Sequence, residues 1–283
     1  MIILLLAVLG LIFGSFVNAL VWRLRQQELA GQKSKIKGQK SKVGKAEESY
    51  SILRGRSMCP TCHHELKARD LVPVLSWLTL RGRCRYCQAP ISWQYPVVEL
   101  LTAAAFALTY LWWPLSLQGA DLFRLVAVLG FLVVFMALAV YDLRWFLLPN
   151  RLVFPLVIAV AIEVVIVGLN MHDWRFVLNS ALGGALIFVV FYLLFQVSNG
   201  AWIGGGDVKL ALGLGMLAGT PLKALLVLFL ASVIGTAVSA PQLAKGRQGL
   251  KVKVPFGPLL LIATWLAVLF GDQILNWYMG LLT

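Results

Sequence analysis

Charged residues are scarce in this sequence, and acidic residues are particularly few. Asp and Glu together number 12 among 283 residues, and all charged residues make up 13%. A soluble globular domain carries about 25% charged residues. Hydrophobic residues make up 60% of the chain, and apolar runs recur along nearly its whole length. The composition therefore excludes an ordinary soluble protein and predicts an all-α polytopic membrane protein.

The first apolar run, residues 1–22, has no basic residue before it. A cleaved signal peptide has a basic stretch at that place. The sequence therefore predicts an uncleaved first transmembrane helix whose N-terminus lies outside the cytoplasm. About eight transmembrane helices are expected in all, and the sixth is short enough to be a half-depth or tilted helix. The expected spans are 2–22, 97–113, 124–141, 152–169, 177–197, 208–219, 222–240 and 257–279.

Basic residues, by contrast, are abundant, and the net charge is +13. The eight-span topology places 22 of the 25 Lys and Arg residues on the cytoplasmic side, all except Arg124, Arg175 and Lys223. Lys and Arg accumulate in cytoplasmic loops, so the basic charge is interpreted as an orientation signal that also attracts anionic lipid. No nucleic-acid partner is expected.

Three domains are predicted from this topology. They are a first transmembrane helix at 1–22, a cytoplasmic loop at 23–96 and a transmembrane core at 97–283. The loop contains a lysine-rich segment, 26–50, in which GQKSK occurs twice. That segment lacks apolar periodicity, which predicts a disordered insert. A basic linker beside an anionic membrane is favoured over a nucleic-acid contact, and no function is assigned to the segment.

Cysteine is limited to four residues, which form two C-x-x-C pairs in the same loop. They are Cys59, Cys62, Cys84 and Cys87. Two such pairs suit a tetrahedral zinc site with four thiolate ligands, and disulfides would be reduced on the cytoplasmic side. His63 and His64 are alternative ligands. A closed four-thiolate site has no open position for a substrate, so the predicted zinc is structural.

Five acidic residues fall in or beside the apolar runs, where an ionisable side chain is costly and is a functional candidate by default. They are Glu99, Asp142, Glu163, Asp207 and Asp272. Glu99 and Asp272 lie near span ends, within reach of interfacial water. For Glu163, a hydrogen bond to a neighbouring helix and a functional role are equally compatible with the sequence. The topology brings Asp142 and Asp207 to the cytoplasmic face.

Asp207 follows three glycines, Gly204, Gly205 and Gly206. An aspartate at a helix start can be a simple cap, but three glycines also permit unusual backbone shapes and the close approach of another chain. Two carboxyls at one depth would share a proton and supply a general base and a general acid. The base would activate water against a peptide carbonyl. The pattern therefore suggests an aspartyl dyad, Asp142 with Asp207, and glycines that bind the substrate backbone.

At these residues the sequence resembles the bifunctional prepilin peptidases, which are membrane aspartyl proteases with a G-x-G-D motif. GGGD, followed by VKLALG, matches that motif, and YDLRWFLLPN resembles the segment with the first catalytic aspartate. GSFVNALVWRL, CPTC, LVPVLSWLTLRGRCRYC, ISWQYPVVEL and VPFGPLL also correspond, in the same order. The resemblance covers about residues 10 to 270.

The resemblance implies that Asp142 and Asp207 are the catalytic acids and that the four cysteines hold zinc. It implies cleavage of the basic leader from type IV prepilins or type II secretion pseudopilins at the cytoplasmic face of the bacterial inner membrane. It also implies methylation of the new N-terminal amine by S-adenosylmethionine. No nucleotide-type fingerprint marks a methyl-donor site, so its residues are unknown. The zinc loop and nearby first-span residues are its expected place, and a peptidase without the second activity stays open.

Two other classes of protein share parts of this pattern. Ion-coupled transporters also have buried acids and broken helices, although the sequence shows no convincing inverted repeat. An inactive scaffold in a secretion assembly would keep the same architecture, although both aspartates are intact here. The oligomeric state is not indicated by the sequence.

Overall fold

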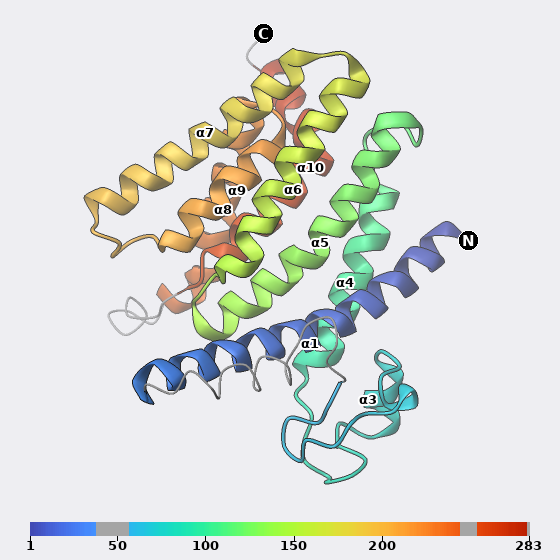
Figure 1. Cartoon of the computed structure of the whole chain (residues 1–283). Coiled ribbons are helices and arrows are strands. Elements are labelled where there is room, and N and C mark those ends of the chain that lie inside the picture. Colours follow the sequence, from blue (N-terminus) through green and yellow to red (C-terminus); the bar gives the residue numbers. More distant parts are fainter. Residues whose placement is uncertain (38–56, 244–253, 282–283) are drawn as a thin grey trace. The chain divides into compact units, whose positions relative to one another are not determined.

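The computed structural model describes residues 1–37, 57–243 and 254–281, and it divides into two compact units, Met1–Leu111 and Trp112–Thr283. Figure 1 shows that the chain is built from helices. Within the described residues, β-pairing is limited to two isolated antiparallel bridges. This confirms the expected all-α architecture.

The first unit contains two long helices and a small module between them. The long helices are α1 (Ile2–Lys37) and α4 (Gln94–Leu111), and the module contains the 3-10 helix η1 (Ala68–Asp70) and the short helix α3 (Leu75–Thr79). The unit therefore includes α4, which the predicted division at residue 97 assigned to the transmembrane core.

The end of α1 differs from the sequence prediction. The helix continues beyond residue 22 as far as Lys37, so residues 31–37, which include the first GQKSK copy, are helical rather than disordered. Lys, Gln and Arg are good helix formers, and the segment 23–37 contains no proline. An established helix can therefore propagate through this polar sequence. The second GQKSK copy lies outside the described residues.

Two glycines bring α1 and α4 into close contact. A Cβ added to Gly10 would lie 2.5 Å from Cα of Ala103, and one added to Gly14 would lie 2.6 Å from Cα of Glu99. Both distances are shorter than real Cβ contacts, and the obstructing atoms are backbone. The Gly-x-x-x-Gly spacing puts both residues on one face of α1, as in membrane helix pairs that pack backbone to backbone.

We expect Gly14→Ala to lower the stability of the first unit by about 1–3 kcal/mol, because α1 and α4 must move apart to accommodate the methyl group. The matched control is Gly130→Ala in the second unit, where an added Cβ meets nothing within 4 Å. Alanine is the better helix former, so the control should melt at or above the parental temperature. Equal melting temperatures for both variants in detergent would contradict this packing.

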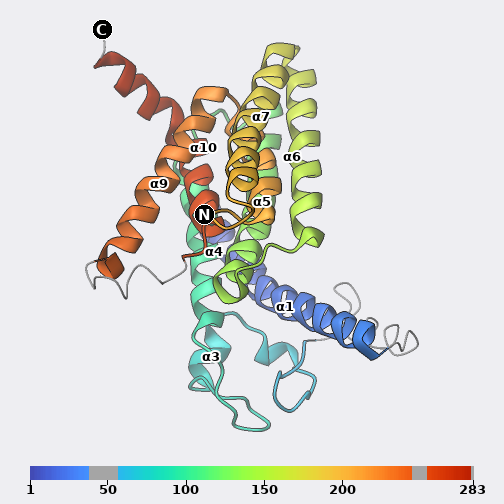
Figure 2. The same cartoon turned by 90° about the vertical axis from the view of Figure 1, so that its left-hand side faces the viewer.

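The described residues of the second unit form a bundle of six helices, and Figure 2 shows α5, α6 and α7 running roughly parallel within it. The helices are α5 (Gly119–Trp145), α6 (Asn150–Met171), α7 (Trp174–Val197), α8 (Gly205–Ala218), α9 (Pro221–Leu243) and α10 (Gly257–Gly280). The shortest helix, α8, contacts α6, α7, α9 and α10. Eight of its 14 residues are buried, which makes it the core element of this unit.

Glycines also bring α7 and α8 into close contact in the second unit. A Cβ on Gly215 of α8 would lie 2.5 Å from the carbonyl oxygen of Gly183 in α7, and one on Gly183 would lie 2.8 Å from the carbonyl oxygen of Gly215. The backbones of α7 and α8 therefore touch. This contact shields the glycine-rich α8 inside the bundle, as the sequence predicted for a short sixth span.

Helices occur at all eight expected positions, and six of them are long and apolar enough to cross a membrane: α1, α5, α6, α7, α9 and α10. The chain is therefore a multi-pass membrane protein. The other two helices are shorter. α4 has 18 residues, beginning with a polar Gln94, and α8 has 14.

Candidate active site and four-cysteine cluster

Asp142 lies in the last turn of α5, three residues before the helix ends at Trp145. The sequence predicted this position at the end of the third span. α5 ends at Trp145, and Phe146 then adopts a left-handed conformation with φ 53° while its N–H donates to the carbonyl oxygen of Asp142 at 2.8 Å. The carboxyl is buried, since Asp142 is 6% exposed. This turn sends Leu148 and Pro149 across to the start of α6.

Asp207 is the third residue of α8, and its carboxyl accepts a hydrogen bond from the backbone N–H of Gly204. The N-cap position is held by Gly204, and no side-chain capping bond is made there. Asp207 therefore assists the cap from the third helical position and does not occupy the N-cap itself. Oδ1 of Asp207 is buried and has no hydrogen-bond partner among the described residues. A buried carboxyl oxygen without a partner makes this side chain a candidate for chemistry.

The three glycines before Asp207 do not adopt the unusual backbone shapes that the sequence suggested. Gly204 has φ −72°, and neither Gly205 nor Gly206 has a positive φ. A Cβ on Gly206 would lie 2.8 Å from Cβ of Leu148. The absence of a side chain at Gly206 therefore makes room for the protein's own loop after α5.

The same leucine also reaches the start of α10. A Cβ added to Gly257 would lie 3.5 Å from Cδ2 of Leu148 and 2.7 Å from Oδ2 of Asp142. The backbone N–H of Gly257 hydrogen-bonds to the Asp142 carboxylate. Leu148 thus packs between the segment that carries Asp207 and the segment that binds Asp142, and the ends of α5, α8 and α10 converge around it.

The two carboxyls interact electrostatically. Burial, and after it the nearby charge of Asp142, raises the pKa of the Asp207 carboxyl to about 7. Asp207 lies outside the six helices that can cross a membrane. Two neighbouring buried carboxyls do not ionise together readily, so such a pair holds one proton near neutral pH. The structure therefore brings together the two aspartates selected from the sequence.

A polar contact fastens the start of α8 to the start of α6. Nζ of Lys209 donates to Oδ1 of Asn150 at 3.1 Å and lies 5.4 Å from the centre of the Phe154 ring. Lys209 lies two residues after Asp207 in α8, and Asn150 is the first residue of α6. The contact fixes one end of α8 beside the loop that contains Leu148.

The other acids near the apolar runs have structural partners. Oε2 of Glu99 accepts the backbone N–H of Val74 at 2.7 Å, Glu163 pairs with Arg124 at 3.5 Å, and Asp272 pairs with Lys223 at 2.7 Å. Glu163 is 2% exposed, and its oxygens have no hydrogen-bond partner among the described residues, so its pairing with Arg124 offsets part of the cost of burying a charge. These contacts favour the structural interpretation for all three residues.

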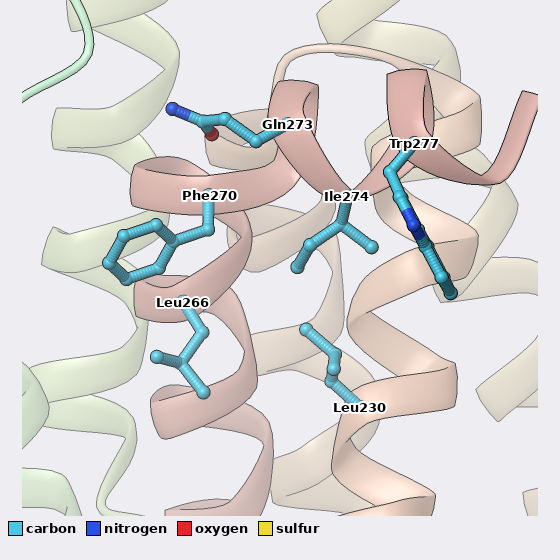
Figure 3. A pocket seen from close by; sticks show the side chains of 6 residues that line it. All are labelled: Leu230, Leu266, Phe270, Gln273, Ile274 and Trp277. Atoms are coloured by element: carbon cyan, nitrogen blue, oxygen red, sulfur yellow. The ribbon is translucent and has the colours of Figure 1, made fainter. Parts of the chain in front are cut away.

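An apolar groove lies elsewhere in the second unit and contains neither aspartate. Its volume is about 470 Å³, and Figure 3 shows its lining of one α9 residue and five α10 residues. They are Leu230, Leu266, Phe270, Gln273, Ile274 and Trp277. The one amide among five apolar side chains provides no acid, base or nucleophile, so the groove is not a candidate catalytic site.

The four cysteines come together in the first unit. Their sulfur atoms all lie within 4.8 Å of one another, and Sγ of Cys59 lies 3.8 Å from Sγ of Cys87. Tetrahedral Zn–S bonds of about 2.3 Å require sulfur atoms about 3.8 Å apart. Cys59 and Cys84 are buried, and all four are free of disulfides. The cluster therefore has the donor set and spacing of a metal site.

Both C-x-x-C pairs have the same local backbone. Each is closed by an isolated bridge, Met58 with Glu65 and Arg83 with Pro90. The residue after each second cysteine is left-handed, with φ 56° at His63 and 60° at Gln88. Each turn directs two thiols to the same side, which explains how two distant pairs share one centre.

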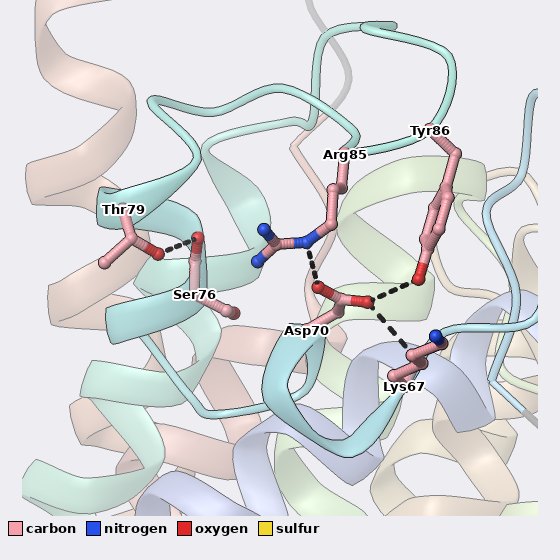
Figure 4. A network of polar contacts seen from close by, with 6 residues as sticks. All are labelled: Lys67, Asp70, Ser76, Thr79, Arg85 and Tyr86. Carbon is pink, nitrogen blue, oxygen red and sulfur yellow. Dashed lines mark hydrogen bonds and ion pairs between the residues drawn. The ribbon is translucent and has the colours of Figure 1, made fainter.

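Side chains join the two turns to the rest of the module (Figure 4). Asp70 of η1 accepts hydrogen bonds from Nε of Arg85 at 2.7 Å and from the hydroxyl of Tyr86 at 3.1 Å. The ring of Tyr86 lies 3.7 Å from the ring of His64. His64 therefore packs between the turns, and the four-sulfur group does not include either histidine.

Sequence reasoning missed Leu148, Gly257 and the Lys209–Asn150 contact. Leu148 and Gly257 carry no reactive group, so no chemical pattern singles them out. Their only signals are the segments LLPN and VPFGPLL, where proline marks a helix start close to a membrane boundary.

Comparisons with known proteins agree with both units. Residues 8–113 match the bacterial peptidase A24 N-terminal domain, and residues 128–240 match the type IV leader peptidase family. A prepilin leader peptidase/N-methyltransferase of Aeromonas hydrophila is 35% identical over 280 residues, covering 95% of this chain and 91% of the relative. The proteins of the same name from Pseudomonas aeruginosa and Bacillus subtilis are each 32% identical, covering 96% and 81% of this chain and 91% and 87% of those relatives. No solved structure matches the chain. The chain therefore belongs to the type IV prepilin leader peptidase (peptidase A24) family.

Proposed function

We propose that this protein cleaves the leader peptide from type IV prepilins or type II secretion pseudopilins and then methylates the new N-terminal amine. The observation that carries the peptidase assignment is the electrostatic interaction of Asp142 and Asp207, at a place where Leu148 packs against both Gly206, next to Asp207, and Gly257, which binds Asp142. Full-length similarity to peptidase/N-methyltransferases supports both activities.

In the peptidase reaction the two aspartates divide the acid and base roles. Asp207, with its pKa raised to about 7, holds the shared proton below that pH. Asp142 takes a proton from water, whose oxygen forms a bond to the scissile carbonyl carbon. The C–N bond then breaks as Asp207 gives its proton to the departing amine. The hydrogen bond from Gly257 orients the Asp142 carboxylate for its part.

Cleavage produces the substrate of the second reaction. The freed amine attacks the methyl group of S-adenosylmethionine, so an N–C bond forms as the S–C bond breaks and the amine loses a proton. We assign the methyl-donor site to the first unit, around the cysteine module and the adjacent part of α1. The separate family match of that unit supports this division of labour.

We assign Zn²⁺ to the four-cysteine cluster, with Cys59, Cys62, Cys84 and Cys87 as its ligands. Four thiolates saturate a tetrahedral ion, so the metal stabilises the fold and offers no position to substrate. The geometry of the sulfur atoms supports this assignment.

We place the enzyme in the bacterial inner membrane with both aspartates facing the cytoplasm. The distribution of Lys and Arg supports this orientation. A prepilin held by its own apolar helix can diffuse in the bilayer and present its leader at that face. Gly204 and Gly205, with added Cβ atoms meeting only Asp207 and Phe195, are the open part of the glycine segment and the proposed contact with the extended substrate.

The test combines both reactions. Purified protein in lipid vesicles is incubated with a prepilin and methyl-labelled S-adenosylmethionine, and truncation and label incorporation are followed together. The proposal expects truncation first and label only on the truncated product. Label on uncut substrate, or neither product with a range of prepilins and pseudopilins, would overturn it.

The two activities should depend on pH in opposite directions. Leader cleavage is expected to fall as pH rises through about 7, where Asp207 loses the shared proton, by up to tenfold per pH unit beyond it. Methylation of a pre-cut peptide should rise over the same range, because only the unprotonated amine attacks and α-amino groups have pKa values of about 7.7–8.0. Initial rates between pH 5.5 and 9 test this. Cleavage that stays constant from pH 6 to 9 would contradict the shared proton.

Zinc removal should unfold the cysteine module and leave the second unit folded. Structural zinc contributes on the order of 10 kcal/mol to the folding of small modules, and the module exposes Arg81, Arg83 and Arg85 as trypsin sites. Trypsin should cut at these residues at least tenfold faster after chelation. Arg151 in α6 serves as the internal control. Unchanged cleavage in protein shown to be metal-free would contradict a structural metal.

A further inference from the structure

The cysteine module exposes an apolar surface that its own fold does not use. Leu75 and Leu78 in α3 are 60% and 56% exposed, and Trp93 is 68% exposed. Leu75 and Leu78 are three residues apart, so they lie on one face of the helix. Val72, just before α3, is also exposed. Several large exposed apolar side chains on one small module mark an interaction surface, which is called the apolar patch below.

The patch is held rigidly. The ring of Trp77 in α3 packs against that of Trp93, with 4.0 Å between the ring centres and 49° between the ring planes, and its Nε1 donates to the carbonyl oxygen of Ile91 at 3.2 Å. Gly82, at φ 67°, packs against the Trp77 ring, because a Cβ there would lie 2.8 Å from it. With Trp77 fixed on the inner side, Leu75 and Leu78 are kept on the outer side.

The start of α3 is hydrogen-bonded to α4, which packs along α1. The N–H of Val74 donates to Oε2 of Glu99 in α4 at 2.7 Å. Glu99 in turn packs against Gly14 of α1. Gly14 lies eight residues, or about 12 Å of helix, before Trp22, which ends the apolar run of α1. The patch therefore begins beside a part of α1 that must be surrounded by lipid.

The exposed surface of α4 continues the patch. Val97 and Leu100 are 46% and 53% exposed, and they follow Trp93 by four and seven residues. Two exposed cations, Arg81 and Arg83, follow α3 directly. Tryptophan beside apolar residues, with Arg next to them, is the composition of a segment at the membrane–water interface.

We propose that α3 is an interfacial anchor that inserts its Leu75–Leu78 face into the bilayer spanned by α1, with Trp93 at the headgroup level and Arg81 and Arg83 binding anionic lipid headgroups. The partner is the lipid bilayer. Continuity with the lipid-facing surface of α4 and the adjoining positive charge both favour lipid over a polypeptide partner. The anchor holds the cysteine module flat against the membrane.

Photo-crosslinking of the full-length protein tests this. Benzoylphenylalanine replaces Leu78, or the exposed Gln88 of the second cysteine turn, in zinc-loaded protein reconstituted in phosphatidylethanolamine and phosphatidylglycerol vesicles. Because neither side chain is buried, both variants should fold. Lipid adducts, detected by mass spectrometry, are expected at position 78 and at least tenfold fewer at position 88. Equal yields at the two positions, crosslinks at 78 to polypeptide, whether this chain or added prepilin, or no adduct at 78 would overturn the proposal.

The headgroup contact is tested by lipid selectivity. Adducts at position 78 should be enriched in phosphatidylglycerol over its bulk fraction, by about fivefold for each basic residue near the surface. Arg81→Gln together with Arg83→Gln should remove that enrichment and leave the total lipid yield at 78 largely unchanged. Enrichment that persists in the double variant would show that other residues hold the headgroups and would overturn the role of this pair.

Discussion

Asparagine in place of Asp207 is expected to lower the rate of leader cleavage by about 10²–10⁴-fold, the usual contribution of a positioned general acid or base. Asparagine keeps the size of the side chain but can neither hold nor release the shared proton. Oδ1 of Asp207 has no hydrogen-bond partner in the described structure, and the amide oxygen of asparagine can still accept the bond from the N–H of Gly204, so the variant should keep its fold. Initial rates of prepilin truncation in vesicles measure the effect. Asp142→Asn should have an effect of similar size.

The matched control is Asp173→Asn. Asp173 also lies at a helix start, where Oδ1 accepts the N–H of Arg175 at 2.9 Å, and asparagine serves equally well at an N-cap. This variant should cleave at the parental rate. Methylation of a pre-cut peptide should persist in the Asp207 variant, because that reaction is assigned to the first unit. Parental cleavage by Asp207→Asn would remove the basis of the proposed mechanism.

The second large effect concerns stability at the far end of α8. Removing one member of the Arg124–Glu163 pair, as in Glu163→Ala, should destabilise the second unit by about 3–5 kcal/mol, because it leaves the largely buried charge of Arg124 without its anionic partner. The side chains of Arg124 and Glu163 are only 14% and 2% exposed. Thermal melting of the purified protein in detergent, followed by circular dichroism, measures the loss.

Two comparisons distinguish a buried charge from simple loss of packing. Arg124→Met combined with Glu163→Leu removes both charges at similar volume and should recover most of the stability. Lys223→Met breaks a pair in which Asp272 is 59% exposed, and such pairs contribute at most about 1 kcal/mol. A double variant no more stable than Glu163→Ala would contradict the electrostatic explanation.

The sequence predicted local features better than contacts between distant segments. The cysteine cluster could be predicted because each C-x-x-C pair forms its own local turn, and binding of one metal ion by all four thiolates would bring the two turns together. The aspartates could be paired because the topology set by charge and apolar length gives both the same face. The actual arrangement of the two aspartates could not be predicted, because it depends on the packing of Leu148 against Gly206 and Gly257. These glycines lie 58 and 109 residues from Leu148 in the sequence and carry no functional group.

Helix ends were the other source of error, for physical reasons. The polar residues after Trp22 read as a loop, yet they are good helix formers and α1 extends through them to Lys37. The glycines before Asp207 suggested an unusual backbone, yet they adopt ordinary φ values and instead leave space for a neighbouring side chain. Glycine marks a close approach as readily as a special conformation, and sequence alone does not distinguish the two.

The length of α8 has a mechanical consequence. Its 14 residues span about 21 Å, less than the roughly 30 Å hydrocarbon layer. Its far end is fixed by Arg124, whose Nη2 donates to the carbonyl oxygen of Leu217, and by Ser180, which donates to that of Gly219. The C-terminal end of α8 is therefore held in place, and Asp207 lies at the opposite end of the helix. One residue inserted into α8 would shift Asp207 by about 1.5 Å along the helix axis and rotate it by about 100° around that axis. The number of residues in α8 therefore determines the depth in the membrane at which a peptide bond can be cut.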